Sequence, residues 1–125
     1  MLDAILALIP DARVGFIGLK REERTLQASA YHQSLPRNLR PFEILLVDPM
    51  LATGGSAVAA MDFLTQHRAQ RVSLVNLVAS PEGVRAVQAR HPQVWIFSAA
   101  IDRRLNARGF IEPGLGDAGD RLFGT

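Results

Sequence analysis

The sequence predicts an α/β fold, in which the strands of a parallel sheet alternate with helical crossovers. Short apolar runs occupy residues 43–47 (EILLV), 71–78 (RVSLVNLV) and 94–97 (VWIF), and segments with helical spacing separate them. Apolar runs of this length are typical of strands that are buried on both faces of such a sheet. With 125 residues, the chain is long enough for one domain around one hydrophobic core.

Two helices are predicted between these strands. The first covers residues 55–67, directly after a turn, and the second begins at Pro81. A proline in the first turn of a helix sacrifices no hydrogen bond, which is why it is a good start for a helix. The inner faces of the two helices are predicted to carry Val58, Met61, Phe63 or Leu64, Val84 and Val87.

The remaining segments are less regular. Residues 2–9 predict a helix with a buried face, and residues 13–19 (RVGFIGL) predict a further strand. Residues 20–40 are polar and lack a long apolar period, which indicates an excursion away from the sheet. Residues 101–125 hold five of the ten glycines and predict a shaped loop or small hairpin, with apolar anchors at Phe110, Ile111, Leu115 and Phe123.

The composition argues against several kinds of partner and site. The formal charge is only +2 and the basic residues are spread along the chain, so we expect no nucleic-acid partner. The apolar start of the chain is too short to cross a bilayer, and we expect no membrane partner. The absence of cysteine excludes disulfides and thiolate metal sites and is compatible with the cytoplasm. No protein-held metal site is predicted, because the three histidines are scattered and are expected at the surface or at helix caps.

The strongest functional signal is the run ILLVDPMLATGGS at residues 44–56. A strand ends in Asp48 and is followed by a Thr-Gly-Gly-Ser turn that opens a helix, at the sheet edge where ligands of such folds bind. Glycines allow the backbone to approach an oxyanion, and the helix start favours negative charge, so the turn predicts a phosphate site. Taken alone, the turn is also compatible with a simple tight connection. It is not a Walker loop, because no lysine follows the glycines.

A second glycine-rich segment lies at residues 111–121 (IEPGLGDAGDR). Such a loop can present backbone donors and acceptors to a planar ring at fixed geometry, as a pyrimidine requires. It is also compatible with a glycine-rich tail that carries acidic turn residues.

A third segment, at residues 18–26 (GLKREERTL), leads to Tyr31. Arg21 lies directly beyond the predicted strand end, where a guanidinium group is well placed to bind a pyrophosphate. A solvated run of charges is the default alternative, and Arg24 and Tyr31 are weaker candidates.

These three segments carry a resemblance to a known family. The run VDPMLATGGSA resembles the phosphoribosyl pyrophosphate (PRPP) motif of type I phosphoribosyltransferases, in the form with proline after the first acid that is similar to the uracil enzymes. The run PGLGDAGDRLFGT resembles the uracil-binding hood of the same family, and the segment around Arg21 resembles its R-x-E-x-T-L stretch. The resemblance thus implies a phosphoribosyltransferase domain over residues 1–125, with an active-site arm at 20–40 and a hood at 101–125.

The resemblance also implies the roles of individual residues. Asp48, Arg21 and Asp117 are the implied catalytic residues, with Asp48 on the ribose hydroxyls and Arg21 on the pyrophosphate. The implied PRPP contacts are Arg21, Asp48, Pro49, Met50, Leu51, Ala52, Thr53, Gly54, Gly55, Ser56 and Asp117. The implied uracil contacts are Ile111, Gly116, Asp117 and Ala118.

By the same resemblance, the chain converts uracil and PRPP to UMP and pyrophosphate, with Mg²⁺ bound through PRPP. A cytoplasmic homo-oligomer, dimer or tetramer, with GTP binding is also implied. Family members are longer at the amino end, where they carry a middle strand of the sheet and an arginine-containing pyrophosphate loop. Two alternatives therefore stay open, namely a non-catalytic remnant that binds UMP or serves in assembly, and an RNA-binding pyrimidine regulator on the same fold.

Overall fold

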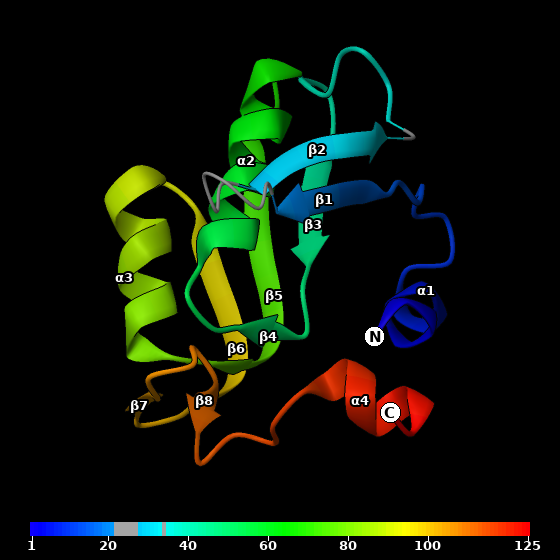
Figure 1. The fold of residues 1–125 in the computed structure, drawn as a ribbon. Coiled ribbons are helices and arrows are strands. Elements are labelled where there is room, and N and C mark those ends of the chain that lie inside the picture. Colours follow the sequence, from blue (N-terminus) through cyan, green and yellow to red (C-terminus); the bar gives the residue numbers. More distant parts are fainter. Residues whose placement is uncertain (22–27, 34) are drawn as a thin grey trace.

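A parallel sheet with two helices against one face forms the centre of the structure, which is a computed structural model (Figure 1). It describes residues 1–21, 28–33 and 35–125, with the backbone alone for residues 20, 21 and 28–33. The central strand is β5 (Arg71–Ala79), which pairs with β3 (Glu43–Val47) and with β6 (Trp95–Ile101). The short strand β4 (Met50–Leu51) pairs with the carboxyl end of β5. The predicted α/β fold with a parallel sheet is confirmed.

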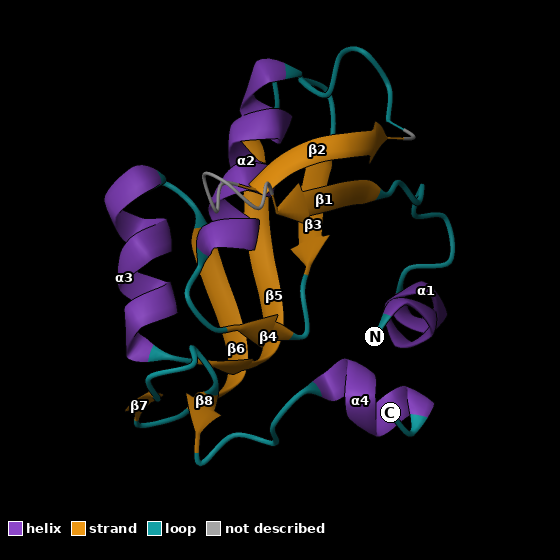
Figure 2. Ribbon diagram, viewed as in Figure 1, coloured by secondary structure: helices purple, strands orange, loops and turns teal. Residues whose placement is uncertain are grey.

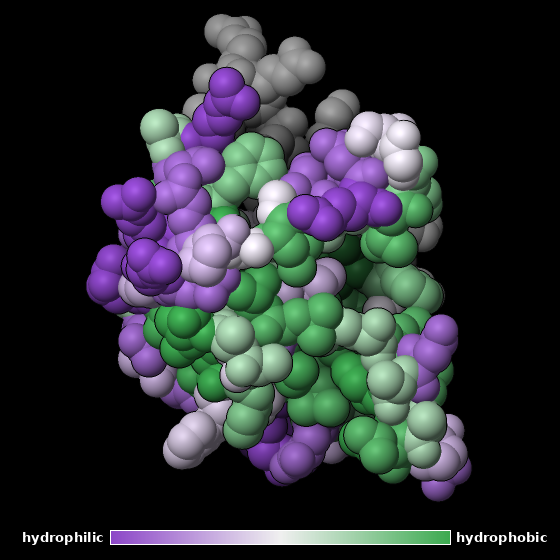
Figure 3. Space-filling model, turned by 90° about the horizontal axis from the view of Figure 1, so that it is seen from below, coloured by the Kyte–Doolittle hydropathy of each residue, from purple (hydrophilic) through white to green (hydrophobic). Residues whose placement is uncertain are grey.

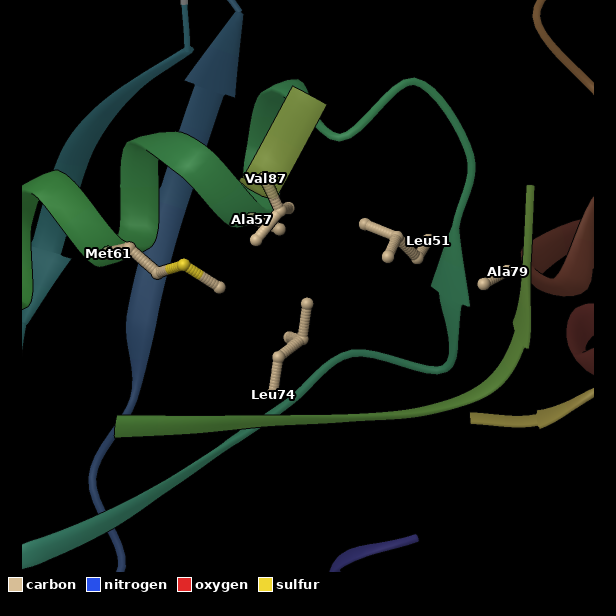
Figure 4. Packing of buried hydrophobic residues seen from close by; sticks show 6 residues of the cluster. All are labelled: Leu51, Ala57, Met61, Leu74, Ala79 and Val87. Carbon is tan, nitrogen blue, oxygen red and sulfur yellow. The ribbon is translucent and has the colours of Figure 1, made fainter. Parts of the chain in front are cut away.

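The crossover helices α2 (Gly55–Gln66) and α3 (Pro81–Arg90) cover one face of this sheet (Figure 2). Side chains from both helices and from β4 and β5 point toward one another between the layers (Figure 4). Burying a side chain of leucine, valine or methionine size contributes about 1.5–3 kcal/mol, so this layer is the main source of stability. The six residues of this core are Leu51, Ala57, Met61, Leu74, Ala79 and Val87.

Most of the predicted inner-face residues of the helices are confirmed. Met61, Leu64 and Val87 are buried, while Val58 and Val84 are half-buried against the core. The expected position of the histidines at the surface or at helix caps is confirmed for His67 and His91, which are the C-cap residues of α2 and α3. His91 is buried at this cap, with its Nε2 atom 2.9 Å from Asp62 Oδ1 on α2. A polar side chain at a helix end is buried here because the second helix packs over it.

The second face of the sheet is apolar and exposed in the described part of the chain. Successive residues of a strand point to opposite faces, so every second side chain of β3, β5 and β6 points away from the helices. The expectation that these strands are buried on both faces is therefore wrong for this part of the chain. The exposed apolar side chains on this face are Leu45, Leu77, Trp95 and Phe97.

The segment before β3 differs from its prediction. Helix α1 (Leu2–Leu8) forms where expected, but none of its residues is buried, because an apolar period does not by itself supply a packing partner. The predicted strand at 13–19 is shifted to β1 (Ile17–Arg21), which pairs antiparallel with β2 (Ala28–Gln33). This hairpin is a sheet of its own, and its backbone lies beside α2.

The C-terminal segment contains the expected small hairpin and one helix that the sequence analysis missed. Strands β7 (Arg104–Leu105) and β8 (Ile111–Glu112) form the hairpin, and α4 (Ala118–Phe123) follows. Helix α4 has six residues, too few for a visible apolar period. Of the predicted apolar anchors only Ile111 is buried, whereas Phe110, Leu115 and Phe123 are exposed.

Figure 3 looks at the lower end of Figure 1, toward which β3 and β5 run. Hydrophobic side chains gather across the middle of this face, and hydrophilic ones lie mostly at its margins. None of the described helices combines the length and the apolar character that a passage through a bilayer requires.

Candidate active site

The site begins at Asp48, directly after the end of β3. The backbone of Asp48 is fixed on both sides: its N–H donates to the carbonyl of Val75 at 3.1 Å, and Asn76 Nδ2 donates to its carbonyl at 2.7 Å. Its side chain is half-buried and accepts a hydrogen bond from Met50 N at 3.3 Å. Burial raises the pKa of the Asp48 carboxyl above its ordinary value, and the hydrogen bond from Met50 opposes this only in part. Asp48 therefore has a fixed backbone and a carboxyl group whose ionised form is less well hydrated than it would be in water.

Residues 49–51 connect Asp48 to the glycine turn along the end of β5. The carbonyl of Pro49 accepts from the N–H groups of Leu77 at 3.0 Å and Val78 at 3.2 Å. Met50 and Leu51 then form β4, and the side chain of Leu51 is 1% exposed in the core. Any contact of Leu51 with a ligand consequently has to come from its backbone.

The predicted phosphate turn lies at the start of α2, with Thr53 and Gly55 exposed and Gly54 buried. Gly54 is the N-cap residue, with a left-handed φ of 83° that favours glycine. The amide of Ala52 donates to Met50 O at 3.1 Å, and that of Gly55 lies 3.5 Å from Thr53 Oγ1. Within the described residues, the amides of Thr53, Gly54 and Ser56 have no acceptor. These three amides, together with the positive end of the α2 dipole, can bind an anion.

The β7–β8 hairpin lies at the same end of the sheet as this loop. The N–H of Asp102, just after β6, donates to Ala79 O at 2.9 Å, and its Oδ2 accepts from Gly114 N at 2.8 Å. The hairpin turn approaches the loop itself, since a Cβ atom placed on Gly109 would lie 3.5 Å from Thr53 Cγ2. The hairpin that carries Ile111 is therefore next to the turn that contains the amides without an acceptor.

The rest of the predicted base site lies beyond β8. Gly116 has a left-handed φ of 77°, and Asp117 caps α4 by accepting from Asp120 N at 3.0 Å. Ala118 is the first residue of that helix. The recorded hydrogen bond of the Asp117 carboxylate is thus made within its own helix, which leaves its implied contacts to base and PRPP as a prediction.

The structure says least about the residues of the predicted active-site arm. Arg21 is the last residue of β1 and Tyr31 lies in β2, and only their backbone is described. Arg24 lies outside the described residues. Their roles stay predictions.

Comparison with known proteins identifies the family. The model of the family described as uracil phosphoribosyltransferase matches residues 1–125, the whole chain. The chain belongs to the uracil phosphoribosyltransferase family.

Relatives and a solved structure agree with this family. Uracil phosphoribosyltransferases of Streptococcus pneumoniae and Enterococcus faecalis are 55% and 56% identical to the chain, covering 100% of it and 60% of each relative. A solved structure of a protein from Aquifex aeolicus is 42% identical, with a TM-score of 0.86 over 98% of this chain and 59% of its own. The chain thus spans about three fifths of the length of the uracil phosphoribosyltransferases it matches.

Several residues that shape the candidate site of this member of the uracil phosphoribosyltransferase family escaped the sequence analysis. Asn76 was visible as a polar residue within an otherwise apolar run, and Ser80 as a possible N-cap before Pro81. Asp102 and Gly83 carried no local signal, because their contacts are with residues distant along the chain.

Proposed function

We propose that this chain forms the nucleotide-building part of a uracil phosphoribosyltransferase, which joins uracil to PRPP to give UMP and pyrophosphate. The observation that carries the proposal is the set of amides without an acceptor at Thr53, Gly54 and Ser56, in the turn that follows the half-buried Asp48. A 5-phosphate on those amides would bring the ribose hydroxyls toward the Asp48 carboxylate. The identity to uracil phosphoribosyltransferases over the whole chain supports uracil as the base.

The proposed mechanism depends on positioning. As the bond between the sugar carbon and pyrophosphate breaks, the sugar gains oxocarbenium character, and a uracil nitrogen bonds to the same carbon and releases its proton to the solvent. The loop amides hold the 5-phosphate, Asp48 orients the ribose, and the hood holds the base through Ile111 and residues 116–118. Arg21 would stabilise the negative charge that gathers on the leaving pyrophosphate.

Magnesium is proposed to reach the site with PRPP. Within the residues that the structure describes, no group of three or more His, Cys, Asp or Glu side chains could hold a metal ion. We therefore propose that the oxygens of PRPP hold the ion and that the Asp48 carboxylate is the acidic group beside the ribose. Bound in this way, the ion would neutralise charge on the pyrophosphate.

The cellular setting is part of the same proposal. PRPP and UMP are phosphorylated and do not cross membranes freely, which favours a cytoplasmic enzyme. A homo-oligomer, dimer or tetramer, and binding of GTP are proposed from the family resemblance alone.

Titration calorimetry on the 125-residue chain tests the proposal. We expect both UMP and PRPP to bind, and Asp48→Asn to weaken both because it removes the charge that orients the ribose hydroxyls. Exposed Gln88→Ala on α3 is the control for purification and folding. Binding of UMP without PRPP would identify a non-catalytic remnant, and binding of neither would leave only a role in assembly.

A further inference from the structure

The corner between β5 and α3 packs against the predicted phosphate turn at residues 52–56, which is called the phosphate loop below. Ser80 is fully buried, and its N–H donates to Leu51 O at 2.9 Å. Its Oγ donates to Ala52 O at 2.6 Å and accepts from Gly83 N at 2.9 Å. One side chain thus joins the carbonyl before the loop to the first turn of the second helix.

Gly83 also contacts the backbone of the phosphate loop directly. A Cβ atom on Gly83 would lie 2.4 Å from Ala52 O and 2.8 Å from Leu51 O. The approach is mutual, because a Cβ atom on Gly54 would lie 3.0 Å from Gly83 O and 2.9 Å from Ala86 Cβ. Backbone therefore packs on backbone at this crossing, and neither glycine leaves room for a side chain.

Helix propensity does not account for a glycine at position 83. It lies inside α3, and no left-handed φ is recorded for it. Alanine is the better residue at such a position, since glycine loses more conformational freedom on folding. The contact with the phosphate loop is the feature of this position that demands glycine.

We propose that Gly83, with Ser80, is a positioning residue for the phosphate of the nucleotide. Both residues are buried and contact the Ala52 carbonyl, which lies in the same peptide plane as the Thr53 N–H and therefore sets the direction of that N–H. Gly83 also packs on the backbone of Gly54, the next residue of the turn. This inference rests on the proposed function only for the identity of the ligand. The placement of the loop itself is a property of the free chain.

The decisive variant is Gly83→Ala. Its Cβ has to move from 2.4 Å to an ordinary contact of 3.4 Å from Ala52 O, which displaces the loop backbone by about 1 Å. Displacements of this size are costly for preorganised sites, so we expect the affinity for UMP to fall about tenfold or more. The affinity for uridine, which lacks the phosphate, should change less than about twofold. Ser80→Ala should lower the affinity for UMP a few-fold, because the carbonyl of Ala52 loses one hydrogen bond but keeps its packing against Gly83.

The measurement is the ratio of the uridine to the UMP dissociation constant, by calorimetry, for the wild type, Gly83→Ala, Ser80→Ala and the exposed control Gln88→Ala. The ratio isolates the contribution of the phosphate, and a general loss of folding would lower both affinities. An unchanged ratio in a folded Gly83→Ala chain would overturn the positioning role.

A second measurement separates this inference from the proposed function. Amide resonances of Thr53, Gly54 and Ser56 in ¹H–¹⁵N spectra of the free chain report on the loop without any ligand. If the wild type bound no UMP while Gly83→Ala shifted these resonances, the positioning role would stand and the proposed function would fail. If they did not move, the positioning role would fail whatever the chain binds.

Discussion

The phosphate side and the base side of the candidate site are held in different ways. On the phosphate side, the chain from Asp48 to Ala52 is tied to β5 and the following corner by backbone and buried side-chain hydrogen bonds, and Leu51 is in the core. On the base side, only Ile111 of the predicted apolar anchors is buried, and the ion pair of Arg104 with Glu112 is solvent-exposed. Exposed pairs of this kind contribute about 0–1 kcal/mol.

This difference indicates a division of labour. A phosphate binds best to amides that are already in place, since their ordering then costs nothing at the moment of binding. A base has to enter and a product has to leave, which is easier beside a segment with few buried contacts. We therefore expect changes on the phosphate side to affect both stability and phosphate affinity, and changes on the base side to affect base recognition alone.

The largest effect is expected for Gly54→Val on the phosphate side. A β-branched residue cannot easily adopt the φ of 83°, and its Cβ would overlap Ala86 Cβ at 2.9 Å. Backbone strain and overpacking together should lower the free energy of unfolding by about 2–5 kcal/mol. Urea denaturation measures this loss, and UMP binding should disappear.

Gly124→Val is the matched control for that variant. Gly124 has a similar φ of 69°, but nothing lies within 4 Å of an added Cβ atom. It should therefore show the backbone strain alone, about 1–2 kcal/mol. Equal losses in the two variants would show that the packing of the loop on α3 contributes nothing.

A smaller and more selective effect is expected for Gly114→Ala on the base side. Gly114 has a φ of 49°, and a Cβ there would lie 2.1 Å from Ile111 O, so the hood has to shift. The affinity for UMP should fall toward that for ribose 5-phosphate, whose own affinity should stay within about twofold. Competition binding with the two ligands measures this. An equal loss for both would contradict the division between the two sides.

The sequence predicted the strand, turn and helix of the proposed phosphate side well because their signals are local. A strand that ends in Asp48, followed by two glycines and a helix start, specifies its own geometry within ten residues, and the structure has these elements at the expected places. The strand at 43–47 and the start of α3 at Pro81 are also confirmed, since short runs and helix-start signals are likewise local.

The features that the sequence did not predict depend mostly on contacts between segments that are distant along the chain. The apolar face of β6 gave no sign that Trp95 and Phe97 are exposed, because an apolar run reports a preference for burial and not the presence of a cover. The role of Gly83 follows from the approach of α3 to the loop, about 30 residues along the chain, and no spacing rule reports that contact. Helix α4 was missed because its six residues are held mainly by the caps at Asp117 and Gly124.

The smallest expected effect concerns the charge of Asp48 and the stability of the phosphate side. Since burial raises the pKa of this carboxyl in the folded chain, the folded state binds its proton more tightly than the unfolded state does. The contribution of Asp48 to stability is therefore greatest at low pH and is lost as the pH rises through the unfolded and then the folded pKa. Asp48→Asn removes this penalty, and at pH 7 it should unfold at a slightly higher temperature than the wild type.

The pH dependence of this difference identifies its cause. At about pH 3, where the carboxyl is protonated in both states, the two melting temperatures should converge. Asp3→Asn on exposed α1 controls for the loss of one negative charge elsewhere. A wild type that melts higher than Asp48→Asn at pH 7 would mean that the hydrogen bond from Met50 outweighs desolvation. The phosphate side would then be stabilised by the Asp48 carboxyl, whereas a higher melting temperature for Asp48→Asn would show that it retains this carboxyl at the expense of stability.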